Sequence, residues 1–87
     1  MELAFVITAH HPGECPETTI IYSPDVAIIS LAAHLRRSIH RDTSYADAVK
    51  EAEQCIEKVT ENLGMSVDMQ LDGFRASITR SLLNEAN

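Results

Sequence analysis

Residues 3–22, LAFVITAHHPGECPETTIIY, place two apolar segments on either side of a proline–glycine pair. In the first segment, Leu3–Ala9, both sets of alternating positions are apolar, which predicts a central strand covered at least partly on both faces. The second segment, Thr18–Tyr22, is rich in β-branched residues and predicts another strand. The residues between them then form the loop of an antiparallel hairpin, with Pro12 and Gly13 at the centre of a type II turn.

Two helices are expected after the hairpin. The Ser-Pro-Asp sequence at 23–25 is typical of a helix start, because serine caps, proline suits the first helical position and an acid favours the positive end of the dipole. This helix is predicted to run to about Arg41. After an interruption at 42–44, a second helix is predicted over 45–63, where Gly64 provides a C-terminal stop.

The remaining chain is assigned one more strand and one more helix. Residues 65–71 alternate between apolar and polar positions, which predicts a strand with one solvated face at the edge of a sheet. The apolar residues of the last segment recur every four positions: Phe74, Ile78 and Leu82. We interpret this spacing as a terminal helix from about Gly73 to Glu85.

The resulting order, β-β-α-α-β-α, predicts an α+β fold of two layers, with a small three-stranded sheet packed against helices. Residues 1–87 are assigned to a single domain, which is the usual organisation for a chain of this length. In the alternative interpretation, residues 65–71 form an irregular link in a mainly helical fold.

The composition restricts the classes of function. The hydrophobic fraction of 45% and the charged fraction of 23% are typical of a globular domain rather than a disordered chain. A net charge of −6 disfavours general nucleic-acid binding, which depends on neutralising phosphates. Two cysteines, Cys15 and Cys55, are too few for a disulfide framework and are interpreted as reduced thiols. The N-terminus lacks a basic region and a long apolar run, so a cytoplasmic protein without signal peptide or membrane span is predicted.

The hairpin loop holds the densest cluster of metal-binding side chains: His10, His11, Glu14 and Cys15. Zinc needs about three or four convergent ligands, and neighbouring residues in an extended segment point to opposite faces. His10 therefore pairs with Cys15, and His11 with Glu14, which leaves each face short of ligands. Further ligands would have to come from His34, His40 or Cys55. A metal-binding domain is kept as an alternative hypothesis, and no metal site or cofactor is assigned.

Nucleophilic catalysis at Cys15 is disfavoured for an electrostatic reason. The acidic side chains of Glu14 and Glu17 oppose formation of the thiolate that such chemistry needs. The sequence also shows no recognisable cluster of oxyanion-hole glycines and no orienting acid. No catalytic residue is assigned, and the sequence predicts a protein that is not an enzyme.

Two predicted helical segments carry charge of opposite sign. Three arginines near the end of the first helix, Arg36, Arg37 and Arg41, have two interpretations: an anion or nucleic-acid patch, or cations that stabilise the helix dipole. We favour the second and keep weak nucleic-acid binding through Arg36–Arg41 as an alternative. The second helix carries an acidic stripe at Glu53, Glu57 and Glu61, which is typical of a solvated face or of a surface that meets a basic partner.

The first helix also carries apolar residues away from its main stripe, at Val26, Ile29 and Ala33. A helix that is apolar on more than one side needs cover on more than one side, and a second copy of the chain is a natural source. The sequence therefore predicts a small acidic protein-binding domain (an adaptor, regulator or inhibitor) that forms a homodimer and binds another, basic protein. The residues assigned to partner binding are His10, His11, Arg37, Arg41, Glu53, Glu57 and Glu61.

Overall fold

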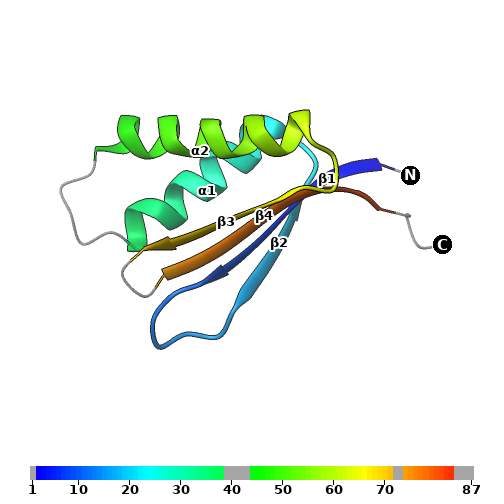
Figure 1. Ribbon diagram of the computed structural model, residues 1–87. Coiled ribbons are helices and arrows are strands. Elements are labelled where there is room, and N and C mark those ends of the chain that lie inside the picture. Colours follow the sequence, from blue (N-terminus) through cyan, green and yellow to red (C-terminus); the bar gives the residue numbers. More distant parts are fainter. Residues whose placement is uncertain (1, 39–43, 72–73, 84–87) are drawn as a thin grey trace.

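The computed structural model describes residues 2–38, 44–71 and 74–83, and within them the chain forms four strands and two helices in two layers (Figure 1). The elements are β1 (Glu2–His10), β2 (Glu17–Ile21), α1 (Pro24–Ser38), α2 (Tyr45–Glu61), β3 (Ser66–Leu71) and β4 (Phe74–Leu83). The predicted α+β class is confirmed. The predicted three-stranded sheet and the order β-β-α-α-β-α are wrong, because the last element is a strand.

The strand β4 replaces the helix that was predicted over residues 73–85. Phe74, Ile78 and Leu82 are four residues apart, and this spacing is common to one face of a helix and one face of a strand. Ala76 completes an alternation in which one side of β4 is buried at Phe74, Ala76 and Ile78. Because β4 pairs with both β1 and β3, its backbone is hydrogen-bonded in the middle of the sheet. These pairings show that residues 74–83 form a strand, whereas the spacing of the apolar residues alone is compatible with a helix or a strand.

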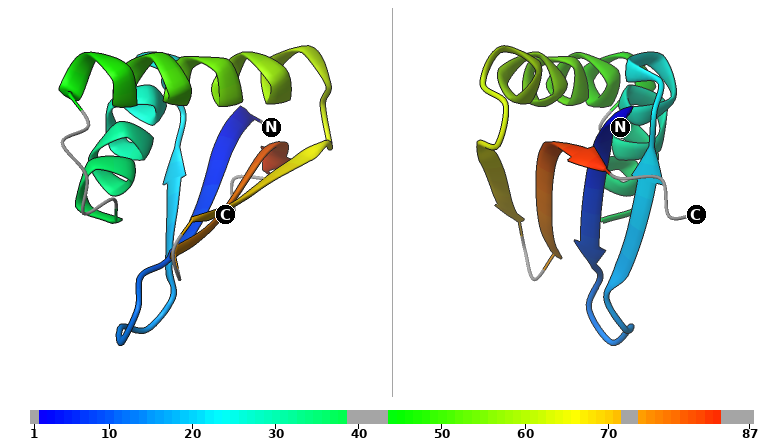
Figure 2. Two further views of the ribbon diagram at one scale, coloured as in Figure 1. Left: turned by 60° about the vertical axis from the view of Figure 1, so that its left-hand side comes forward. Right: turned by 90° about the vertical axis from the view of Figure 1, so that its right-hand side faces the viewer.

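The sheet is antiparallel throughout, with strand order β2-β1-β4-β3. The predicted central position of the first strand and the predicted edge position of residues 65–71 are therefore confirmed. Both helices lie on one face of the sheet, which leaves the opposite face of β1 without helical cover (Figures 1 and 2). We call this opposite side the open face.

The hydrophobic core lies between the sheet and the helices. α1 packs chiefly on β1 and β2, whereas α2 packs on β3 and β4, and the two helices contact each other. The largest fully buried side chains come from both layers: Phe5, Ile7, Leu31, Leu35, Val59, Phe74 and Ile78. The sheet residues that enter this core occupy alternate positions, so the intervening side chains project from the open face.

The boundaries of α2 lie close to the predicted ones. The Ser44 hydroxyl accepts a hydrogen bond from the backbone N–H of Asp47, as expected for the start of α2. α2 ends at Glu61, just before the predicted stop at Gly64, whose backbone has a φ of +85°. The last residues of the predicted first helix, 39–41, lie outside the described residues. Neither of the two helices in the described ranges has the length and apolar character needed to cross a membrane.

Candidate functional site

The hairpin between β1 and β2 contains the predicted turn. The N–H of Glu14 donates to the carbonyl of His11 at 3.1 Å, and Gly13 has a φ of +76°. A positive φ at the third residue is the requirement of a type II turn, which glycine meets at little cost. The two neighbouring histidines before the turn differ in burial: His10 is exposed, whereas His11 is only 6% exposed.

The buried His11 belongs to a ring cluster that joins the hairpin to α1. Its ring stacks on Phe74 with 4.7 Å between centroids, and its Nε2 lies 2.9 Å from Nδ1 of His34. Such a hydrogen bond requires one nitrogen to donate and the other to accept. Burial, followed by the nearby His11, holds the pKa of His34 below its ordinary value of 6.5. The hydrogen bond and the stacked rings therefore join the hairpin to α1 and β4.

An ion pair links the same two segments at the surface. The Arg37 guanidinium donates to Oε2 of Glu14, and both side chains are about half-exposed. This hydrogen bond lowers the pKa of the Glu14 carboxyl. Arg36 is also engaged within the chain, with its guanidinium carbon 5.6 Å from the centroid of the Tyr45 ring. Arg41 lies outside the described residues. The two described arginines of this segment are thus held by partners in their own chain, which does not favour the nucleic-acid alternative.

The ligands of the alternative metal hypothesis are not brought together in the described ranges, where no group of three or more His, Cys, Asp or Glu could hold a metal ion. His34 meets His11 rather than His10. Cys15 is exposed on the hairpin, while Cys55 is buried with its Sγ 3.8 Å from Sδ of Met69. Burial raises the pKa of the Cys55 thiol. His40, the remaining suggested ligand, falls outside the described residues.

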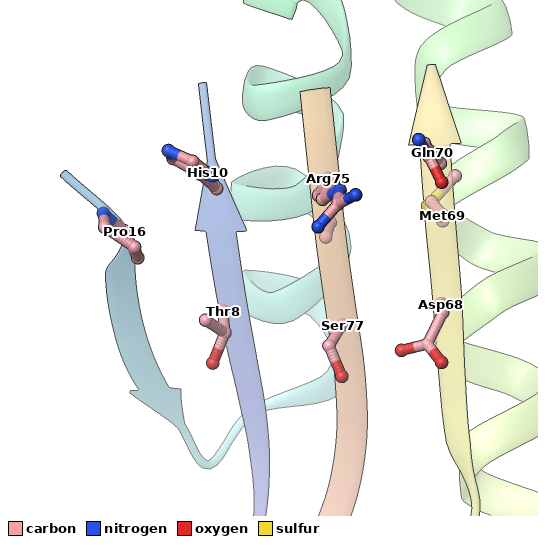
Figure 3. A pocket seen from close by; sticks show the side chains of 9 residues that line it. Thr8, His10, Pro16, Asp68, Met69, Gln70, Arg75 and Ser77 are labelled. Atoms are coloured by element: carbon pink, nitrogen blue, oxygen red, sulfur yellow. The ribbon is translucent and has the colours of Figure 1, made fainter. Parts of the chain in front are cut away.

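The open face carries a trough of about 540 Å³ over β1, β4 and β3. Figure 3 shows its polar side chains in two rows across the strands. In one row, Arg75 lies between His10 and Gln70, its register partners on the two neighbouring strands. In the next row, Ser77 lies between Thr8 and Asp68. Pro16, Met69 and Ala76 complete the lining. Of the predicted partner-binding residues, His10 is therefore the one that reaches this trough.

A second surface is apolar and lies in the segment from β2 to α1. Four large apolar side chains there are 51–55% exposed: Ile20, Tyr22, Val26 and Ile29. Ala33 is exposed as well, so the stripe of α1 that was predicted to need cover is uncovered in the single chain. β2 is also an edge strand of the sheet. Ile21 enters the core, so its neighbour Ile20 projects from the open face at the β2 edge, whereas Val26, Ile29 and Ala33 lie on α1. We call these residues together, Ile20, Tyr22, Val26, Ile29 and Ala33, the apolar surface.

The acidic stripe of α2 points to solvent. Glu53, Glu57 and Glu61 are all exposed, and the opposite side of the helix is buried at Ala52, Ile56 and Val59. Sequence reasoning missed the trough residues of β3 and β4, because it assigned β4 to a helix. Arg75, Ser77 and Asp68 can be placed in two rows only when the pairing of β3 with β4 is known.

Comparison of the chain with protein-family models, with curated proteins and with solved structures found no match.

Proposed function

We propose that this chain is a non-enzymatic protein-binding domain whose working form is a homodimer joined through α1 and β2. The observation that supports the dimer most strongly is the apolar surface, where four large side chains within residues 20–29 are about half-exposed. Large apolar side chains exposed close together on one element, as Val26 and Ile29 are on α1, are typical of an interaction site. Because α1 packs on the β1–β2 half of the sheet, its stripe and the β2 edge belong to the same half of the molecule.

The charges of α1 favour a second copy of this chain as the occupant. Asp25 lies in the first turn and Arg36 in the last, with the exposed residues Val26, Ile29 and Ala33 between them. When two identical helices pack antiparallel about a twofold axis, the start of each faces the end of the other. Asp25 then meets the arginine end of the partner helix, and the two helix dipoles are also opposed favourably.

The edge strands differ in how well they suit such pairing. Antiparallel pairing of two β2 strands about Thr19 places Glu17 opposite the apolar Ile21, so no like charges meet. On β3, Asp68 is central, and pairing there would bring two identical carboxylates together. A charge on an exposed edge is a common protection against strand addition. β2 is therefore the edge that we assign to the dimer.

The acidic stripe of α2 supports the proposal that the partner protein is basic. Glu53, Glu57 and Glu61 are exposed and lie on the helix that packs on the β3–β4 half of the sheet, away from the proposed dimer surface. The chain would act as an adaptor, regulator or inhibitor that presents two such stripes. We propose the cytoplasm as its compartment, supported by two free cysteines that lie in separate places, Cys15 exposed and Cys55 buried.

Sedimentation equilibrium and size-exclusion chromatography with light scattering test the dimer. We expect a dimer at micromolar concentration for the natural chain and a monomer for Ile29→Glu, because a charge would then be buried in the interface. Leu63→Glu is the matched control, since Leu63 is equally exposed but lies beyond the end of α2. A natural chain that is monomeric at these concentrations would overturn the dimer, and so would an Ile29→Glu variant that dimerises as well as the Leu63→Glu control.

A further inference from the structure

We infer that the trough on the open face is a binding site for a short zwitterionic peptide, with the carboxylate at Arg75 and the ammonium group at Asp68. The site uses residues of β1, β3 and β4, with Pro16 beside them, so it is independent of the apolar surface on α1 and β2. Its volume, about 540 Å³, is within the range of small-ligand sites in proteins.

The first row of the trough is suited to a carboxylate. Arg75 has the planar fork of N–H donors that matches the two oxygens of a carboxylate. His10 and Gln70 flank it on the same face and can add hydrogen bonds from an imidazole and an amide (Figure 3). Within the described residues, the Arg75 side chain forms no ion pair, because the one ion pair there joins Arg37 to Glu14.

The second row is suited to a donor with positive charge. Asp68 is exposed and forms no ion pair with a described residue. An ionised carboxylate only accepts hydrogen bonds, so an ammonium group is its natural ligand. Its presence also disfavours phosphate and polyanions, which a trough with Arg75 and His10 alone would attract.

The hydroxyls beside these two charges can hold the peptide groups of the ligand. The Thr8 hydroxyl lies 3.2 Å from that of Thr18, and the Ser77 hydroxyl lies 3.0 Å from that of Ser66. Each hydroxyl has one donor and two acceptor positions, so these pairs leave capacity for a ligand. The side chains therefore offer charge at two points and neutral hydrogen bonds beside them.

The spacing of the two rows selects the length of the peptide. Arg75 and Ser77, and with them their register partners, lie two residues apart along the strands. Two residues of a strand span about 7 Å. The first and third Cα atoms of an extended tripeptide are also about 7 Å apart. Asp68 is also displaced sideways by one strand spacing, about 5 Å, because it lies on β3 and Arg75 lies on β4. A tripeptide with free ends therefore matches the spacing of the two charged positions better than a single amino acid does.

The test is a titration of the ¹⁵N-labelled natural chain, followed by NMR, with tri-alanine as the probe. We expect saturable shifts at the Thr8 and Ser77 amides and at the Arg75 side chain. Arg75→Gln and Asp68→Asn should each weaken binding by about ten- to a hundredfold, the range expected for a lost charge-assisted hydrogen bond. Lys50→Gln, at an exposed position of α2, is the matched control and should bind normally.

Ligand variants show which charged groups of the ligand are needed for binding. Tri-alanine amide lacks the carboxylate and N-acetyl-tri-alanine lacks the ammonium group, so both should bind at least about tenfold more weakly than tri-alanine. Free alanine, acetate and inorganic phosphate should also bind more weakly. The proposal is overturned if tri-alanine causes no shift at the trough, if phosphate or acetate binds as tightly, or if Arg75→Gln binds like the natural chain. Equal binding of the N-acetylated peptide would overturn the role of Asp68.

Discussion

At the scale of single residues, the fold turns two histidines that are 23 positions apart into one hydrogen-bonded pair. Two imidazole nitrogens share a hydrogen bond only when one of them has no proton, so the bond is lost when both rings are fully protonated. Several neighbouring residues change the pKa of His34. His11 and Arg37 lower the pKa of His34 and Glu17 raises it, while burial is the largest influence and lowers it.

We therefore expect the free energy of unfolding to fall as the pH is lowered through 6.5, the ordinary pKa of histidine. His34 has a lower pKa in the folded chain than in the unfolded one, so the unfolded chain binds the proton first and acid favours it. The stabilisation is fully present above 6.5 and is lost as the pH falls toward the pKa of folded His34. Glu14 adds a separate loss below its ordinary value of 4.5, because Arg37 lowers its pKa.

Urea denaturation over this pH range measures the effect. His34→Gln keeps a polar side chain without titrating, and its stability should depend less on pH between about 7 and 5, near the ordinary histidine pKa. His10→Gln is the control, because His10 is exposed and outside the ring cluster. The interpretation is contradicted if His34→Gln and the natural chain have the same pH dependence.

At the scale of elements, burial changes along β4, and this difference makes a prediction about its packing. Ile78 is fully buried in the core, whereas Leu82, four residues later, is 52% exposed. Replacing a buried Ile with Ala usually costs about 2–5 kcal/mol of stability. Ile78→Ala should therefore destabilise the chain by about that amount, and Leu82→Ala by less than about 1 kcal/mol, as for a surface position. Chemical denaturation of both variants measures these losses of stability. Equal losses for the two variants would contradict the described packing of β4.

The elements that could be predicted are those whose local signals agree. In the hairpin, β-branched residues and a Pro–Gly turn favour the same structure, and Ser44 caps α2 as its sequence indicates. β4 could not be assigned from the spacing of Phe74, Ile78 and Leu82, because a spacing of four residues is compatible with both the helical and the strand periodicity. The Asp72-Gly73 dipeptide between two alternating segments is typical of a β-hairpin, and it was the available signal for a strand.

The candidate sites were less predictable than the elements, because they depend on pairing across the sheet. The exposed stripe of α1 could be predicted, since Val26, Ile29 and Ala33 follow helical spacing within one element. The trough could not, because Arg75 meets His10 and Gln70 only through the registers of three strands. The His11–His34 pair likewise depends on where α1 crosses the hairpin.

At the scale of the whole molecule, a two-layer fold with helices on one side creates two unequal surfaces. Both helices lie on one side of the sheet (Figure 2). The open face holds the trough with its polar lining, and the helices carry the exposed stripe of α1 and the acidic stripe of α2. Dimerisation through α1 and β2 would use neither the trough residues nor the acidic stripe. A dimer of this kind therefore presents two copies of each remaining surface to its partners, which increases effective affinity without any new contact.

The twofold arrangement of that dimer can be tested by exchanging charges. Asp25→Arg should weaken dimerisation, because it places a cation against the arginine end of the partner's α1. Adding Arg36→Glu to the same chain should restore it, since the exchanged charges then face each other again across the axis. The two single variants are the controls, and sedimentation equilibrium at low and high salt is the measurement, because screening should reduce every difference. If the double variant is no tighter than either single variant, α1 does not pack antiparallel against its copy.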